Sequence, residues 1–174
     1  MRARWGHLLG DEGSGYAIGL AGLRAVARAA DGRGPNTALT ELLLGRMNLD
    51  RPQDLIHRIY GAAAPRNAIA SLSPVIQNAA QEGDKKAQEI IQTAGHELAL
   101  AVWAVADQLD LHGPIPCALA GSVLIKGPAV PAALHQSIHK LGLPLAPITP
   151  VEEPAQGAIK LARDLATGEM NDSS

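Results

Sequence analysis

A glycine-rich turn near the start of the chain gathers the residue types best suited to bind a polar ligand. Residues 5–16 have the sequence WGHLLGDEGSGY, in which Asp11 and Glu12 follow Trp5 closely. A carboxylate in such a turn accepts hydrogen bonds from hydroxyl groups, and a nearby tryptophan offers a flat apolar face, a pairing that suits a sugar. The same pattern is also typical of a plain tight turn, in which glycine supplies positive φ and the acidic side chains stay solvated.

Two further segments could contribute to a ligand site. A short apolar stretch ends in Gly121-Ser122, where small residues would let backbone N–H groups approach a phosphate or an adenosine. Ser71 precedes the helix start Ser73-Pro74, whose free amides could meet an anion or a ribose. Both segments are equally typical of ordinary turns and caps. The Gly121 segment lacks the Lys-Ser/Thr ending of a P-loop, which excludes Walker chemistry.

Histidine and cysteine are poorly spaced for a metal site. His135 and His139 could share one helix face, but neither a third ligand nor an acidic residue accompanies them. We therefore predict no metal ligands. The single cysteine, Cys117, falls in an apolar stretch, where we expect a small, inert, buried side chain. One cysteine cannot form an intramolecular disulfide, which favours a cytoplasmic setting.

A helix-rich chain must position these candidate residues. Apolar spacing and cap signals predict helices over residues 15–30, 37–47, 52–60, 73–81, 84–109, 128–141 and 153–166. Ser14, Asp50 and Asp84 are the expected N-caps. Short strands are predicted over residues 114–120 and 145–148, so the class is α/β with few strands. Because so small a sheet would be incomplete, we expect another strand in residues 1–9, in missing chain or in a partner.

Composition excludes several classes of protein. Of the 174 residues, 47% are hydrophobic and 18% charged, which argues against a disordered chain. The formal net charge of -2 argues against nucleic-acid binding. Aromatic residues make up only 2%, so the core must be aliphatic and suits closely packed helices. No apolar run has the length of a membrane span and the first residues do not form a signal peptide, so we expect a soluble, cytoplasmic protein.

Taken together, the motifs resemble those of the BadF/BadG/BcrA/BcrD ATPase family, and within it the N-acetylglucosamine kinase branch. The resemblance rests on residues 5–19, on Gly83-Asp84, on residues 120–123 (AGSV) and on residues 154–158 (PAQGA), in this order along the chain. It implies the helix-rich C-terminal domain of the actin/hexokinase/Hsp70-like ATPase (ribonuclease H-like) fold. This domain would span residues 1–168, with a flexible tail over residues 169–174.

The resemblance also implies site residues, cofactors and partners. The implied residues are Trp5, Gly6 and Asp11 for the amino sugar, and Gly121, Ser122 and Ser71 for the nucleotide. ATP and Mg²⁺ would be the cofactors. The family's phosphate-binding hairpin of the Asp-Gly-Gly type and its catalytic aspartate have no counterpart here. We therefore expect no catalytic residue in this chain, an N-terminal domain as its missing partner, and no turnover by the isolated chain.

Two other functions remain open. The chain could be a non-catalytic binding or oligomerisation module that forms a homodimer through its alanine-rich helices. It could also belong to a BadF-type ATPase activator of a radical dehydratase. Such an activator needs cysteines to hold an iron–sulfur cluster between two subunits, and the lone Cys117 argues against it.

Overall fold

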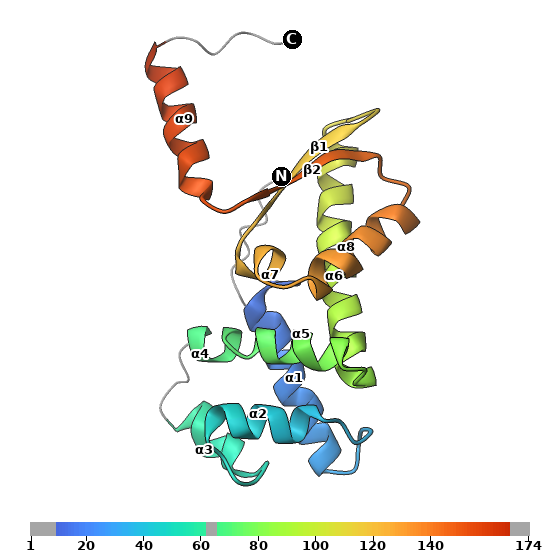
Figure 1. The fold of residues 1–174 in the computed structure, drawn as a ribbon, viewed down its shortest axis with the longest axis vertical. Helices are drawn as coiled ribbons and strands as arrows, with labels where there is room; N and C mark the ends of the chain where they lie inside the picture. Colours follow the sequence, from blue (N-terminus) through green and yellow to red (C-terminus); the bar gives the residue numbers. More distant parts are fainter. Residues whose placement is uncertain (1–9, 62–65, 168–174) are drawn as a thin grey trace.

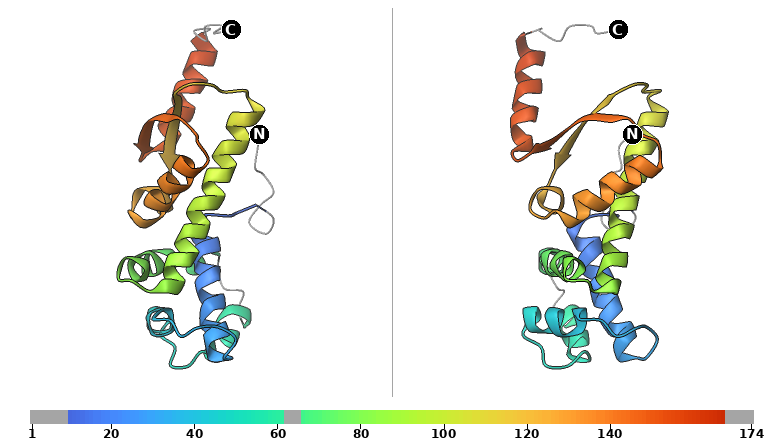
Figure 2. Two further views of the ribbon diagram at one scale, coloured as in Figure 1. Left: turned by 90° about the vertical axis from the view of Figure 1, so that its right-hand side faces the viewer. Right: turned by 45° about the vertical axis from the view of Figure 1, so that its right-hand side comes forward.

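The fold is built around one long helix, α6, which runs through most of the molecule (Figure 1). A computed structural model describes residues 10–61 and 66–167. The helices are α1 (Gly15–Ala30), α2 (Leu39–Met47), α3 (Asp54–Tyr60), α4 (Arg66–Ala70), α5 (Ser73–Gln81), α6 (Lys85–Gln108), α7 (Ser122–Ile125), α8 (Ala129–Lys140) and α9 (Pro154–Thr167). The strands are β1 (Ile115–Ala120) and β2 (Leu145–Val151). Helices α1 and α5 pack against α6 towards one end of the molecule, and α8 packs along it nearer the sheet (Figures 1 and 2).

Side-chain caps fix the starts of α1 and α6, as the sequence predicts. The Ser14 hydroxyl oxygen accepts a hydrogen bond from the Ala17 N–H at 3.1 Å, and an Asp84 carboxylate oxygen accepts one from the Ala87 N–H at 2.8 Å. The predicted cap at Asp50 is wrong. Helix α3 begins at Asp54, whose carboxylate instead accepts a hydrogen bond from the Arg51 N–H at 3.2 Å and closes the preceding turn.

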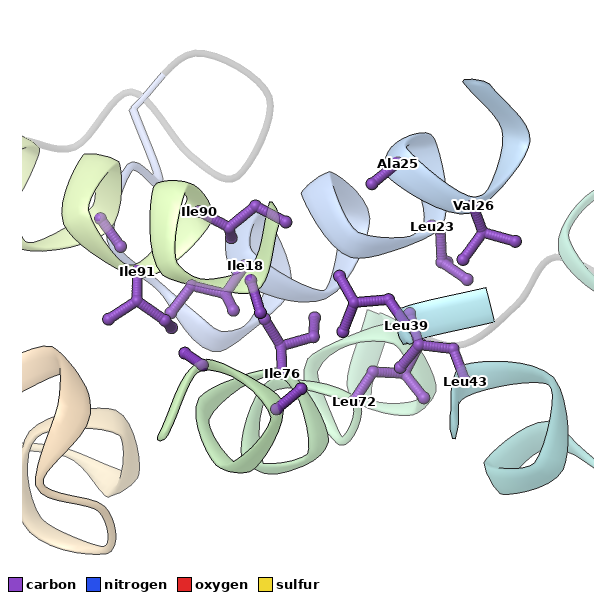
Figure 3. Packing of buried hydrophobic residues seen from close by; sticks show 14 of the residues in the cluster. Ile18, Leu23, Ala25, Val26, Leu39, Leu43, Leu72, Ile76, Ile90 and Ile91 are labelled. Atoms are coloured by element: carbon purple, nitrogen blue, oxygen red, sulfur yellow. The ribbon is translucent and has the colours of Figure 1, made fainter. Parts of the chain in front are cut away.

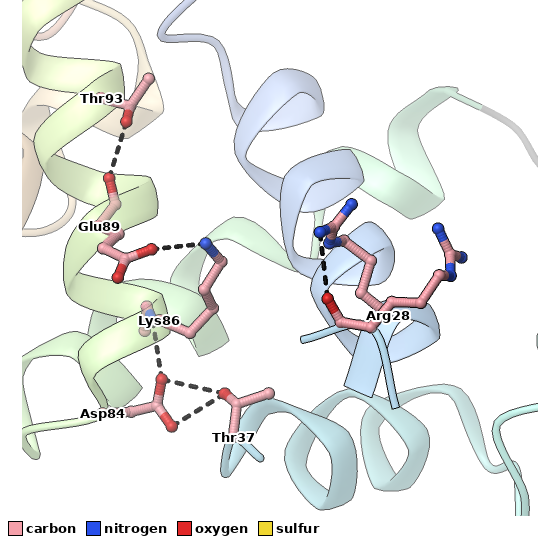
Figure 4. A network of polar contacts seen from close by, with 8 residues as sticks. Arg28, Thr37, Asp84, Lys86, Glu89 and Thr93 are labelled. Atoms are coloured by element: carbon pink, nitrogen blue, oxygen red, sulfur yellow. Dashed lines mark hydrogen bonds and ion pairs between the residues drawn. The ribbon is translucent and has the colours of Figure 1, made fainter. Parts of the chain in front are cut away.

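Asp84 also ties the start of α6 to the loop before α2 (Figure 4). The Thr37 hydroxyl donates to both carboxylate oxygens, at 3.0 and 2.9 Å, and the Ala38 N–H donates at 2.8 Å. Burial alone would raise the pKa of this carboxyl, but the bonds from Ala87, Ala38 and Thr37 outweigh it and hold the pKa below its usual value. The Gly83-Asp84 motif therefore has a structural role in this chain.

The main core is aliphatic and lies among α1, α2, α5 and α6 (Figure 3). Ile18 and Ile76 are almost completely buried there, as are Leu39, Leu43 and Val26. Helix α1 approaches α4 closely because residue 19 is glycine: a Cβ at this position would lie 2.1 Å from the Ile69 carbonyl oxygen. This close approach holds α4 next to the start of α1.

A second, smaller core joins α6 and α8 to the sheet. It contains Ala99, Leu119, Leu134 and Ile138. Strands β1 and β2 pair in parallel, with Ala120 opposite Val151, and the connection between them includes α7 and α8. The described residues contain this one two-stranded sheet. The extra strand expected in residues 1–9 lies outside the described residues.

Two short helices depart from the expectations, whereas the last helix forms where it is predicted. Helices α4 and α7 were not predicted, because neither is long enough to show a helical repeat of apolar residues. Helix α9 stands apart from the body in Figure 1, and its apolar side chains Ile159, Leu161 and Leu165 are about 60% exposed. In the described part of the chain, every helix is too short or too polar to cross a membrane.

Candidate functional site

A cavity of about 480 Å³ lies where α1, α4, α5 and α7 meet. Its lining comes from residues 14–16, from residues between 66 and 78, and from residues between 122 and 128. These are the glycine turn, the Ser71 segment and the Gly121 segment of the sequence analysis. The volume is within the range of small-molecule sites. The fold therefore brings all three predicted segments to one place.

The glycine turn holds Asp11 against Ser14 and Arg66, two residues that line this cavity. Gly13 has φ of 78°, which places the Ser14 N–H 3.0 Å from the Asp11 carbonyl oxygen and closes the turn. The Ser14 hydroxyl donates to Asp11 Oδ2 at 2.8 Å, and the Arg66 guanidinium contacts the same oxygen at 2.6 Å. Among the described residues both contacts go to Oδ2, so Oδ1 can accept a hydrogen bond from a ligand hydroxyl.

Arg66 itself lies between the turn and the cavity. Its guanidinium carbon is 5.7 Å from the centre of the Tyr16 ring, in addition to the ion pair with Asp11. Both Arg66 and Tyr16 line the cavity. Arg66 was not predictable from the sequence, because an arginine far from the turn along the chain gives no signal that α4 packs beside α1.

The Gly121-Ser122 turn places the start of α7 at the cavity. Gly121 has φ of 95° and ψ of 154°, a backbone conformation that side chains with a Cβ rarely adopt, and its carbonyl accepts from the Leu124 and Ile125 N–H groups at 3.1 Å. Ser122 follows directly, is exposed and lines the cavity. Gly121 thus adjoins the cavity lining, and its role as a nucleotide contact stays a prediction.

Ser71 lines the same cavity at the junction of α4 and α5. Its hydroxyl donates to the Ala68 carbonyl at 2.7 Å, and its side chain is exposed. The hydroxyl oxygen can still accept a hydrogen bond, so a contact with a ligand is compatible with this local bond.

The cavity favours an anion. Helices α1 and α5 both begin at it, and in the described structure their first turns carry no acidic side chain. Helix N-termini carry partial positive charge from their unpaired N–H groups. Arg66 and Lys126 both line the cavity, and Arg66 is paired with the Asp11 carboxylate, so Lys126 adds the uncompensated positive charge of the two. A phosphate group would be stabilised in this setting.

Not all of the predicted residues can be placed. Trp5 and Gly6 lie outside the described residues. Glu12, next to Asp11, lines a different cavity between α1 and α6, together with Lys86 and Glu89. His135 and His139 are exposed on α8, and the described residues contain no group of three side chains that could hold a metal ion.

The fold and the site together define a helix-rich α/β ATPase-like domain. Residues 3–162 match the sequence profile of the BadF/BadG/BcrA/BcrD ATPase family. The chain belongs to this family, and its fold is the actin/hexokinase-like ATPase fold.

Two kinases are similar to this chain in sequence. Over 108 residues, 62% of this chain, it is 39% identical to an N-acetylmuramic acid/N-acetylglucosamine kinase of Clostridium acetobutylicum. Over the same length it is 40% identical to an N-acetyl-D-glucosamine kinase of Dictyostelium discoideum. The matched segments cover only 35% and 34% of those proteins.

Two solved structures share the fold. A candidate N-acetylglucosamine kinase from Chromobacterium violaceum matches 91% of this chain with a TM-score of 0.67 and 29% identity. A second candidate N-acetylglucosamine kinase, from Porphyromonas gingivalis, matches 91% with a TM-score of 0.64 and 23% identity. This chain spans 50% of each of those proteins.

Proposed function

We propose that this chain is the part of an ATP-dependent amino-sugar kinase that binds the sugar and the adenosine of ATP. The named relatives are N-acetylglucosamine kinases, which supports an N-acetylglucosamine-like acceptor. The observation that carries the proposal is the one cavity that the glycine turn, Ser71 and Ser122 share, because such a cavity would bring a sugar and a nucleotide together. Such a kinase would work in the cytoplasm, where ATP is made available.

The residues have separate roles in this proposal. Asp11 accepts hydrogen bonds from sugar hydroxyls through Oδ1, while Ser14 and Arg66 hold its other oxygen. Trp5 and Gly6 complete the sugar contact. Gly121, Ser122 and Ser71 contact the nucleotide, and Lys126, which lines the same cavity, adds a positive charge beside it.

The γ-phosphoryl group of ATP would pass to a sugar hydroxyl, with the bond to ADP breaking and the hydroxyl proton going to a general base. In the described structure no aspartate or glutamate lines the cavity, so we assign that base to a part of the whole kinase outside the segment described here. Mg²⁺ would arrive with the ATP phosphates, which are its usual ligands together with one or two carboxylates. We therefore expect the isolated chain to bind ligands without turning them over.

Calorimetric titration with ADP and with N-acetylglucosamine tests the proposal. We expect Asp11→Ala to abolish sugar binding and to leave ADP binding within about threefold of wild type, because Asp11 lies at the sugar end. The matched control is Glu12→Ala, which removes the adjacent carboxylate from a different cavity and should leave both affinities unchanged. Lys126→Ala should weaken ADP and spare the sugar.

Two results would contradict this proposal. One is a folded wild-type chain that binds neither ligand at millimolar concentration. The other is a purified chain that, with ATP, Mg²⁺ and N-acetylglucosamine, turns over at an ordinary kinase rate of about 1–100 per second.

A second candidate function is a non-catalytic oligomerisation module. It is favoured by the exposed apolar side chains of α9, which this fold leaves uncovered. If so, the chain would form homodimers whether or not a nucleotide is present. Light scattering during size-exclusion chromatography, with and without ADP, separates the two proposals.

A further inference from the structure

Gln77 is buried beside the cavity, yet its carboxamide oxygen is unpaired. The residue is 5% exposed, and among the described residues its Oε1 is the buried side-chain oxygen left without a hydrogen-bond partner. The Nε2 group makes one long contact, 3.5 Å to the Ser73 hydroxyl oxygen. A buried acceptor without a partner destabilises the fold, because it has lost its bonds to water. Gln77 lines the cavity, so a ligand there could supply the missing donor.

Residue 127 makes room for this side chain. A Cβ on Gly127 would lie 2.7 Å from Gln77 Oε1, so a larger residue there would displace the amide. Position 77 therefore carries an amide although its oxygen is unpaired, and the residue packed against that oxygen is glycine. An apolar side chain at position 77 would have avoided the unpaired oxygen.

Gln77 lies at the opposite end of the cavity from the sugar-binding turn. At one end, Gly15 at the start of α1 lies against Ala70. At the other, Gly127 lies against Gln77, seven residues further along. Helices α4 and α5 follow one another in nearly the same direction (Figure 1), so the contact at Gln77 lies further along the cavity than the contact at Ala70.

The separation between the sugar-binding turn and Gln77 determines which way round a nucleotide would lie in the cavity. In the proposed function the sugar lies at Asp11, and phosphoryl transfer requires the phosphates to point towards it. The base is then the part of the nucleotide furthest from Asp11, and it would lie near Gln77. This step rests on the proposed function.

We propose that Gln77 recognises the nucleotide base, with Oε1 accepting a hydrogen bond from the 6-amino group of adenine. The side-chain amide of glutamine presents an acceptor and a donor side by side. Adenine presents the complementary pair, an amino donor next to a ring-nitrogen acceptor, and glutamine pairs with it in this manner in other proteins. In the structure Nε2 faces the Ser73 hydroxyl, and this orientation leaves Oε1 as the acceptor.

Affinities for three nucleotides test this assignment. The ligands are ADP, the diphosphate of purine riboside, which lacks the 6-amino group, and 2′-deoxy-ADP. We expect wild type to bind ADP about tenfold more tightly than the purine riboside diphosphate, as one buried hydrogen bond would give. In Gln77→Met this ratio should fall to about one. The control, Gln81→Met, changes an exposed glutamine one turn later on α5 and should keep the tenfold ratio.

Thermal unfolding distinguishes a binding residue from a structural one. Replacing a residue that only stabilises the fold would lower Tm. Because Gln77→Met removes the unpaired oxygen, we expect its Tm to equal or exceed that of wild type while its preference for ADP disappears. Gln77→Leu serves as a second variant of similar volume.

The possible failures are distinguishable. If wild type binds ADP but the ratio survives in Gln77→Met and Gln77→Leu, or is about one already, the assignment of Gln77 is wrong and the proposed function stands. If the two variants lose a preference for ADP over 2′-deoxy-ADP instead, Gln77 contacts the ribose and the assignment to the base is wrong. If folded wild type binds none of the three nucleotides, the proposed function fails together with the inference.

Discussion

Removing the Asp84 carboxylate should loosen the contact between the start of α6 and the loop before α2. Asp84→Ala deletes a helix cap, worth about 1 kcal/mol, and two further hydrogen bonds, from Thr37 and Ala38, worth about 0.5–1.5 kcal/mol each. Asp84 is partly exposed, so water replaces some of the lost hydrogen bonds. We therefore expect the free energy of unfolding to fall by about 2–3 kcal/mol. For a chain of this size that lowers Tm by about 5–10 °C.

The pH dependence of this loss follows from the lowered pKa of Asp84. A carboxyl whose folded pKa is below its unfolded value stabilises the fold fully above the unfolded value. The stabilisation disappears as pH falls through the folded value, because both states are then protonated. The difference in Tm between wild type and Asp84→Ala should therefore be largest near neutral pH and should shrink below about pH 4.

Differential scanning calorimetry or circular dichroism at several pH values measures both effects. Asp31→Ala is the matched control: this carboxylate makes an exposed ion pair with Arg33, and its loss should change the free energy of unfolding by less than about 0.5 kcal/mol. The reasoning is refuted if Asp84→Ala lowers Tm no more than Asp31→Ala does. It is also refuted if the full difference persists at about pH 2.5.

Three further predictions concern other parts of the fold. Gly95→Ala should destabilise the protein by about 1–3 kcal/mol in denaturant titration, because a Cβ there would lie 2.5 Å from that of Ala133 and push α8 off α6; an unchanged midpoint would contradict this. Burial raises the pKa of the Cys117 thiol, so at pH 7 it should react with a disulfide reagent at least severalfold more slowly in the folded chain than in the unfolded one; equal rates would show that the thiol is accessible and ionised. If the chain forms dimers, the double variant Ile159→Glu/Leu165→Glu should shift it towards monomer in light scattering, and an unchanged mass would rule out α9 as the contact.

The glycine motifs and helix starts were predictable from the sequence because they depend on nearby residues. Ser14 and Asp84 cap helices whose N–H groups are only three residues away, so the residue types alone indicate them. The wrong prediction of a helix cap at Asp50 also has a local cause. There the chain makes an extra turn after Pro52, and Asp54 supplies the carboxylate instead.

The amino-acid sequence by itself determined the family, the helix-rich α/β class, and Asp11, Ser71, Gly121 and Ser122 as candidate residues. Only the tertiary structure decided that three distant segments share one cavity, because this depends on how closely α1, α4 and α7 pack. It also revealed Arg66 beside Asp11 and an unpaired amide at Gln77. Ion pairing and the burial of a polar atom are properties of neighbours in space, and the local pattern of residues does not record them.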